Sequence, residues 1–219
     1  MSTVLPDLPP TNWTTADVHA WLPGFPAERI CVHPTPGTAT ETDVLEAEAR
    51  TNRICELIDG TLVEKVMASL ESMLAAELIY RIRRYLEGND LGILMAGDGL
   101  LKILPEQIRA PDVSFIRWDR FADHKLPQAA IYAVAPDLAV EILSEGNTVA
   151  EMNRKLRDYF HAGVRLVWYI EPKTRTARAY TAVRDWTEIG HDGVLVGGQV
   201  LPGFQLPLAQ LFERVPAEG

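Results

Sequence analysis

The sequence lacks the features that mark several large classes of protein. No apolar run approaches the roughly 20 residues that a membrane-spanning helix needs. The N-terminal stretch MSTVLPDLPP has no basic region followed by an apolar core, so it does not have the form of a secretory signal. Only two cysteines occur, Cys31 and Cys55, and their spacing is not that of a metal motif. We therefore expect a cytoplasmic protein in a reducing compartment, without membrane association.

Several common catalytic signatures are also missing. The five histidines are scattered, and none pair at the spacing of zinc ligands. Ser144 does not lie in a nucleophile elbow, and no glycine-rich loop is followed by Lys and Ser or Thr. These absences argue against a zinc enzyme, a serine hydrolase and a P-loop nucleotide-binding protein.

The length and composition are those of an ordinary globular chain. Its 219 residues, 47% hydrophobic and 23% charged, suffice for one sizeable domain with an extension, and no internal repeat occurs. The Pro- and Thr-rich residues 1–27 form the expected N-terminal extension, with Trp13 and Trp21 and a short helix at 16–22. We expect the domain over residues 28–213 and a tail over 214–219.

Apolar periodicity predicts a mixture of helices and strands, hence an α/β fold. Asp59-Gly60 between two alternating runs, 53–58 and 61–66, is a strong hairpin signal. The pattern also predicts a helix from a capping box at Thr40 toward residue 50, and a long helix over 69–87. The apolar stripe expected on that long helix is Leu70, Leu74, Leu78, Ile82, Tyr85 and Leu86. Later elements are expected as a strand pair at 92–96 and 100–104, a hairpin at 175–181 and 186–189, a strand at 194–201 and a closing helix at 206–212.

Residues 111–172 contain the candidate catalytic residues. Asp112 precedes the apolar run 113–116, and Glu141 follows Leu-Ala-Val at 138–140. A helix should then begin at Thr148, with Glu151 completing a capping box, and end near Gly163. A further strand is expected at 166–170.

This helix should bury one face and expose the other. Its apolar residues recur at i, i+4, i+7 and i+8; they are Met152, Leu156, Tyr159 and Phe160. Lys155 lies on the flank of that face, whereas Arg154, Arg157 and Asp158 are expected to point to water. A strand followed directly by a helix brings the helix start near the strand's C-terminal end, which places Lys155 near Glu141.

Two carboxylates and a lysine around one point suit metal-assisted phosphodiester hydrolysis. Carboxylate oxygens hold a hard cation such as Mg²⁺, and a neighbouring strand would bring Asp112 beside Glu141. Each residue also has a structural alternative: Asp112 as a turn cap, Glu141 in a structural salt bridge, and Lys155 as a surface cation of the helix.

The order and spacing of several motifs resemble a known family. These are Pro111-Asp112, Val140-Glu141-Ile142-Leu143-Ser144, Asn147-Thr148, Lys155, Tyr159, Gly163-Val164 and Trp168, with Glu56-Leu57-Ile58-Asp59-Gly60 before them and Leu201-Pro202-Gly203-Phe204 after them. Over about residues 28–213 the chain resembles the Uma-type restriction endonucleases of the PD-(D/E)XK nuclease superfamily. The resemblance implies a restriction-endonuclease-like mixed β-sheet flanked by helices.

The resemblance also implies an activity. It suggests a DNA endonuclease that uses Mg²⁺ or Mn²⁺, with Asp112, Glu141 and the backbone carbonyl of Ile142 on the metal. The superfamily lysine would stand at position 143, which is Leu143 here, so its role passes to Lys155 in the helix, beside the attacking water. The resemblance further suggests a homodimer. Glu71 has two alternative roles: it holds a metal-bound water, or it is an ordinary acidic residue at the N-terminus of a helix.

The net charge of the chain argues against binding to nucleic acid. Proteins that hold nucleic acid usually carry a basic face, whereas this chain has a net charge of −9. A local basic stripe of Arg81, Arg83, Arg84, Lys102 and Arg109 would compensate, unless these are separate solvated charges. A catalytically silent module of the same fold, binding DNA or a protein, therefore stays an alternative to the endonuclease. A hydrolase of another phosphate ester is a third possibility.

Overall fold

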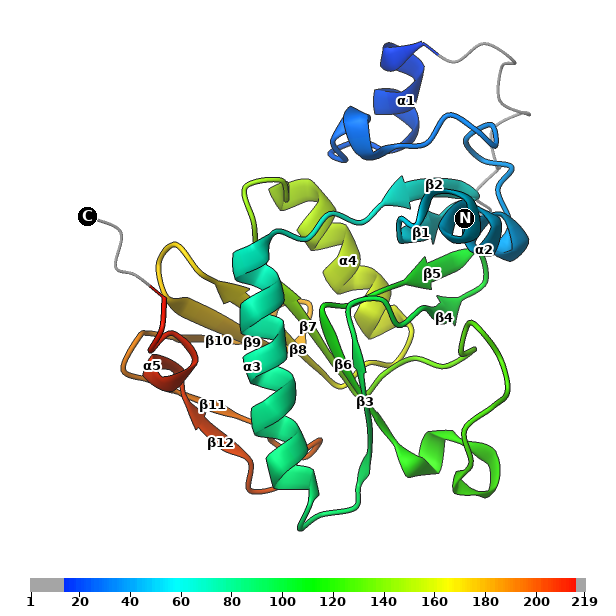
Figure 1. The fold of residues 1–219 in the computed structure, drawn as a ribbon. Helices are drawn as coiled ribbons and strands as arrows, with labels where there is room; N and C mark the ends of the chain where they lie inside the picture. Colours follow the sequence, from blue (N-terminus) through cyan, green and yellow to red (C-terminus); the bar gives the residue numbers. More distant parts are fainter. Residues whose placement is uncertain (1–13, 216–219) are drawn as a thin grey trace.

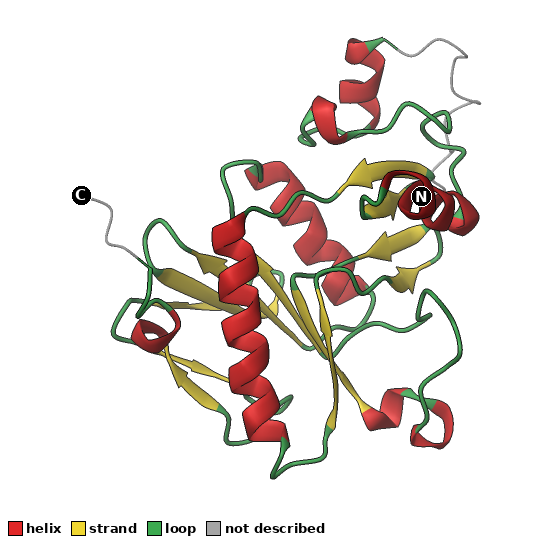
Figure 2. Cartoon of the chain, viewed as in Figure 1, coloured by secondary structure: helices red, strands yellow, loops and turns green. Residues whose placement is uncertain are grey.

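The computed structural model describes residues 14–215, and its centre is a six-stranded mixed sheet (Figures 1 and 2). Trp13 lies outside the described residues. The strand order is β10-β9-β8-β7-β6-β3, and only β7 and β8 run parallel. The strands are β3 (Gly92–Ala96), β6 (Val113–Arg117), β7 (Leu138–Ile142), β8 (Leu166–Glu171), β9 (Thr176–Ala182) and β10 (Asp185–Ile189).

The two long helices cover opposite faces of this sheet. The helix α3 (Ser69–Leu86) packs with alternate strand residues such as Val140 and Trp168. The helix α4 (Val149–His161) packs on the other face, against Ala139 and Tyr169. Because successive strand residues point to opposite faces, Glu141 lies on the α4 face with Ala139. The sequence thus determines on which side of the sheet the candidate site forms.

The apolar pattern predicts a strand, a helix and a strand in this order, and the structure joins them as the parallel crossover β7–α4–β8. Thr148 caps α4 by accepting a hydrogen bond from the Glu151 N–H at 3.1 Å, and Gly163 follows the helix with a positive φ of 89°. The expected capping box is only half formed. The Glu151 carboxylate turns instead to Arg29, 3.0 Å away, because that pairing neutralises a fully buried charge.

A second, four-stranded antiparallel sheet lies beside the first, in the order β2-β1-β5-β4 (Figure 1). Its hairpin turns at Asp59 and Gly60, whose φ angles of 47° and 67° are those the Asp-Gly pair predicts. The helix α2 (Glu41–Thr51) covers one face, and it begins with the full capping box expected at Thr40. The strands are β1 (Cys55–Ile58), β2 (Thr61–Glu64), β4 (Leu101–Leu104) and β5 (Gln107–Arg109).

The N-terminal segment packs on the other face of this smaller sheet. The short helix α1 (Thr15–Trp21) confirms the helix expected there, and the 3₁₀ turn η1 (Ala27–Arg29) follows it. The Trp21 indole donates to the Thr61 hydroxyl at 3.0 Å. The apolar cluster that joins segment and sheet consists of Val18, Leu22, Phe25, Ile30, Ile58 and Val63.

The C-terminal part completes the α3 face. The expected hairpin is confirmed as β9 and β10, and a two-stranded ribbon follows. Its elements are β11 (Val194–Val196), β12 (Gln205–Pro207) and the short helix α5 (Leu208–Leu211). Two 3₁₀ turns, η2 (Trp118–Arg120) and η3 (Ala122–His124), lie between β6 and β7. Within residues 14–215, no helix combines the length and apolarity that crossing a membrane requires.

Several details of the expected fold are wrong. The strand expected at 194–201 ends at Val196, and the closing helix expected at 206–212 spans Leu208–Leu211. The strands at 92–96 and 101–104 exist, but they do not pair with each other, since β3 joins β6 and β4 joins β5. On α3, Leu70 is partly exposed while Glu71 is buried. The helix therefore directs a carboxylate, rather than its first leucine, toward the sheet.

Candidate active site

Asp112 and Glu141 face each other across two adjacent strands. The register pairs Val113 with Val140, so Asp112 stands opposite Glu141 one step further along. Directly opposed residues of an antiparallel pair point to the same face, with Cβ atoms about 4.5–5.5 Å apart. Both carboxylates are buried on the face that α4 covers. The structure thus brings together the two acidic residues that the sequence singles out.

The Asp112 carboxylate has a different partner on each oxygen. Its Oδ2 accepts the Ile142 backbone N–H at 2.7 Å, where β7 continues past the start of β6. Its Oδ1 lies 2.9 Å from Nζ of Lys65, which follows β2. Since the N–H and C=O of one strand residue point to the same side, the Ile142 carbonyl also faces the β6 side of β7. Asp112 is therefore held by both sheets.

Glu141 contacts two residues of α4. Lys155 Nζ lies 3.2 Å and 3.1 Å from its two carboxylate oxygens, and the Tyr159 hydroxyl donates to Oε1. Lys155 and Tyr159 are four residues apart and lie on the same helix face, which is why both reach the same carboxylate. The expected proximity of Lys155 to Glu141 is confirmed.

A second buried ion pair extends the site into the smaller sheet. Glu56 on β1 stands opposite Arg109 on β5, with Arg109 Nη1 at 3.0 Å from Glu56 Oε2. Glu56 Oε1 accepts the Ala110 N–H at 3.1 Å and lies 3.3 Å from Lys155 Nζ. Arg109 also pairs with Asp158 of α4. Lys155 therefore joins a carboxylate from each sheet, at the junction between them.

Burial and charge shift the pKa values of these groups in different directions. Burial raises the pKa of Glu56, but Lys155, Arg109 and Lys65 outweigh it and lower the pKa to about 2. For Glu141 burial prevails over Lys155, and the negative charge of Asp112 adds to it, so the pKa is raised above its ordinary value. Glu56 is thus a fixed anion, whereas Glu141 takes up a proton more readily than an ordinary glutamate.

The two α4 residues keep their protons. Burial acts to lower the pKa of Lys155, but Glu141 and Glu56 outweigh it and hold the pKa above the ordinary lysine value. The pKa of Tyr159 is raised well above its ordinary value by burial and by the charges of Glu141 and Glu56. Lys155 is therefore suited to act as a cation and not as a general base, while Tyr159 acts as a neutral donor.

The donor set fits a hard divalent cation. Asp112 and Glu141 supply carboxylate oxygens from neighbouring strands, and Mg²⁺ commonly binds through one or two carboxylates while keeping several waters. Within residues 14–215, no group of three or more His, Cys, Asp and Glu side chains is arranged to hold a metal ion. A metal here would therefore depend on two carboxylates, a backbone carbonyl and water.

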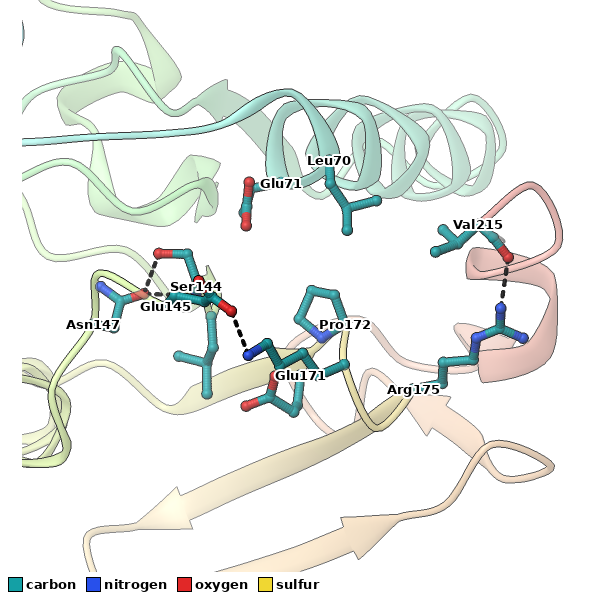
Figure 3. Close-up of a pocket in the computed structure, with 11 residues that line it drawn as sticks. Leu70, Glu71, Ser144, Glu145, Asn147, Glu171, Pro172, Arg175 and Val215 are labelled. Carbon is teal, nitrogen blue, oxygen red and sulfur yellow. Dashed lines mark hydrogen bonds and ion pairs between the residues drawn. The ribbon is translucent and has the colours of Figure 1, made fainter. Parts of the chain in front are cut away.

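A pocket of about 700 Å³ opens at the C-terminal ends of β7 and β8, directly after Glu141 and Ile142 in the chain (Figure 3). The first turn of α3 forms the opposite wall, from which the Glu71 side chain points inward (Figure 3). The Glu71 carboxylate is buried, and its Oε2 has no hydrogen-bond partner among the residues that the structure describes. The pocket is lined by Leu70, Glu71, Leu143, Ser144, Glu145, Asn147, Glu171, Pro172, Lys173, Arg175 and Val215.

Sequence reasoning missed part of this site. Lys65 was not singled out, and the only local signal was a lysine directly after a strand. Asp158 and Arg154, expected to point to water, pair with Arg109 and Asp59 respectively because the smaller sheet lies against this side of α4. Of the three residues assigned to water, Arg157 is exposed, whereas Arg154 and Asp158 are partly buried.

The expected basic stripe is wrong. Arg109 is completely buried, and Lys102 pairs with Glu41 at 3.0 Å. Arg81 pairs with Glu77 on its own helix, and Arg83 and Arg84 are exposed. The five cations therefore do not share one surface.

Comparison with known proteins assigns the family. The model of the Uma2 family, described as "Putative restriction endonuclease", matches residues 41–209, which is most of the chain. The chain belongs to the Uma2 family. The match covers every residue of the ion-pair network described above, from Glu56 to Tyr159. A comparison with curated proteins gives no match.

A solved structure confirms the fold of this Uma2 protein. The protein is similar to the crystal structure of a "putative nuclease belonging to DUF820" from Anabaena variabilis, with a TM-score of 0.66 and 20% sequence identity. The similarity covers 74% of the present chain and 92% of the other. The fold is therefore the restriction-endonuclease-like fold that the sequence motifs predict.

Proposed function

We propose that this Uma2 protein is a metal-dependent endonuclease that hydrolyses DNA phosphodiester bonds. The observation that carries the proposal is the placement of Asp112 opposite Glu141 on adjacent strands, with Lys155 3.1 Å from Glu141. Family membership and the nuclease fold of the similar structure support it.

Asp112, Glu141 and the Ile142 carbonyl would hold Mg²⁺ or Mn²⁺. A bound divalent cation would lower the pKa of water and neutralise charge on the phosphate. Lys155 would keep its positive charge beside Glu141 and assist the attacking water. Tyr159 would fix the orientation of the Glu141 carboxylate through its hydrogen bond.

The pocket after β7 is a suitable approach for the DNA strand. Ser144 and Asn147 supply polar groups there, and Leu143 and Pro172 supply apolar walls. The scissile phosphate would reach Asp112 and Glu141 from this end of the strands. A homodimer would allow both strands of a duplex to be cut, and analytical ultracentrifugation with and without DNA tests that part of the proposal.

The test compares wild type with Glu141→Ala and with the matched control Glu41→Ala, whose side chain is 44% exposed, pairs with Lys102 and does not line the pocket. Calorimetric titration of Mg²⁺ and Mn²⁺ is run beside plasmid nicking on the same preparations. We expect metal binding and nicking in wild type and Glu41→Ala, and loss of both in Glu141→Ala. Nicking should also stop when EDTA removes the metal.

A catalytically silent module that binds DNA or a protein is the second candidate. The net charge of −9 and the pairing of each site carboxylate with a cation favour it. Wild-type protein that binds neither cation, together with a Glu141→Ala variant that folds equally well or better, would refute the endonuclease proposal and favour this alternative.

A further inference from the structure

Lys65 occupies a site built for a cation. Its ammonium lies 2.9 Å from Asp112 Oδ1 and donates to the backbone carbonyls of Gly97 and Ala110 at 3.0 Å and 2.5 Å. A lysine has three N–H donors, so these three oxygens satisfy all of them. The Lys65 side chain is only 8% exposed. The ammonium is thus enclosed by three oxygens: one from Asp112 directly before β6, one from Ala110 directly after β5 and one from Gly97 directly after β3.

These three oxygens are chemically the ligands that a hard metal ion prefers. One carboxylate and two backbone carbonyls are typical oxygen donors for such cations. The other Asp112 oxygen already accepts the Ile142 N–H, so Oδ1 is the oxygen that Lys65 holds. A divalent cation and the Lys65 ammonium compete for Oδ1, because two like charges buried against the same oxygen repel each other.

We propose that Lys65 is a tethered cation that closes the metal site by competing with the divalent cation for Asp112. This inference rests on the proposed function, since it assumes that Asp112 is a metal ligand. Lys65 is accordingly a positioning residue: it holds Asp112 in place while no metal is bound, and leaves Oδ1 when a metal binds.

Release of Lys65 links metal binding to the substrate. A buried ammonium without an anion is costly, so the displaced Lys65 needs a new negative partner. The phosphodiester of a nucleic acid provides one beside the same carboxylate. Metal and nucleic acid should therefore each tighten the binding of the other, with reciprocal coupling.

The experiment measures Mn²⁺ affinity by calorimetry and by electron paramagnetic resonance, with and without a short phosphorothioate duplex that resists cleavage. Lys65→Met removes the ammonium but keeps an unbranched side chain. Its matched control is Lys102→Met, whose lysine is 40% exposed and pairs with Glu41. Without DNA, Lys65→Met should bind Mn²⁺ about ten- to a hundredfold more tightly than wild type, and Lys102→Met should not differ from it. The duplex should tighten Mn²⁺ binding in wild type more than in Lys65→Met.

A second variant keeps the test valid if Lys65→Met does not fold. A Cβ at Gly97 would lie 3.0 Å from Lys65 Nζ and 2.8 Å from the flexible end of Met67. Gly97→Ala should therefore push the ammonium from Asp112 and tighten Mn²⁺ binding in the same direction.

The possible outcomes separate the two proposals. Wild type that binds Mn²⁺, with no tightening in Lys65→Met or Gly97→Ala, refutes the role of Lys65 and leaves the endonuclease proposal standing. Absence of Mn²⁺ binding in wild type and in both variants refutes the metal site itself and the role of Lys65 with it.

Discussion

Replacement of Glu56 by glutamine should destabilise the protein strongly without removing any side-chain volume. Glu56 is the anion shared by Arg109 and Lys155, and all three side chains are buried. The glutamine keeps an acceptor for the Ala110 N–H but removes the charge. Arg109 would keep only Asp158, and Lys155 only Glu141, as acidic partners in the network.

The structure sets the magnitude of this loss. Removing one partner of a buried ion pair costs about 3–5 kcal/mol. The lowering of the Glu56 pKa from 4.5 to about 2 corresponds to about 3 kcal/mol, which agrees with the lower end. For a chain of this size the melting temperature should fall by about 6–20 °C. Glu64→Gln is the matched control, because its partner Arg53 is 64% exposed and the pair should contribute less than about 1 kcal/mol.

The stabilisation by Glu56 should depend on pH in a specific way. The pKa of Glu56 is lower in the folded state than in the unfolded state, so its stabilisation is present above pH 4.5 and is lost as the pH falls toward 2. Chemical denaturation of wild type and Glu56→Gln at pH 7 and pH 3 measures this. A loss below about 1 kcal/mol at pH 7, or a gap between the two proteins that is unchanged at pH 3, would refute the reasoning.

Three further predictions concern neighbouring features. The pKa of Glu141 is raised in the folded state, so the contribution of this residue to the stability of wild type decreases as the pH rises above 4.5. The melting temperature of Glu141→Gln relative to wild type should therefore rise between pH 5 and pH 8. A constant difference between the two melting temperatures would contradict this. Tyr159→Phe removes a donor to the Glu141 carboxylate and should cost about 1.5–3 kcal/mol in urea denaturation, whereas a change below about 0.5 kcal/mol would mean that the hydrogen bond is unimportant. Gly60→Ala should lower the free energy of unfolding by more than about 1 kcal/mol, because the φ of Gly60 is 67° and a Cβ there would lie 2.6 Å from the Gly37 backbone. Thermal melting measures this, and Gly88→Ala is the control because an added Cβ there would have open space around it.

The sequence was most informative where structure depends on near neighbours. The capping boxes, the Asp59-Gly60 turn and the spacing of Met152, Leu156 and Tyr159 are local patterns, and each predicts its element correctly. The proximity of Lys155 to Glu141 was predictable for the same reason, since one strand–helix connection joins them. Assignment of the metal and of catalytic roles to these residues stays a prediction.

The missed features depend on contacts between distant segments. Lys65 and Asp112 are 47 positions apart, and no periodicity indicates that the ends of β2 and β6 meet. The pairing partners of β3 and β4 could not be read from their apolar pattern, because two adjacent strands in sequence are compatible with one sheet or with two. Burial of Arg109 follows from that same division into two sheets.

The order of the buried charges along the chain has a consequence for synthesis on the ribosome. Glu56 and Arg109 form one pair, and Lys65 and Asp112 form another, so all four residues are made before Glu141, Lys155 and Asp158. At about 5–20 residues per second, Lys155 is added some seconds after Glu56. The part of the chain made first contains two pairs of oppositely charged residues, so these charges can neutralise one another during this interval. The nascent chain therefore need not wait for α4 before the smaller sheet begins to form.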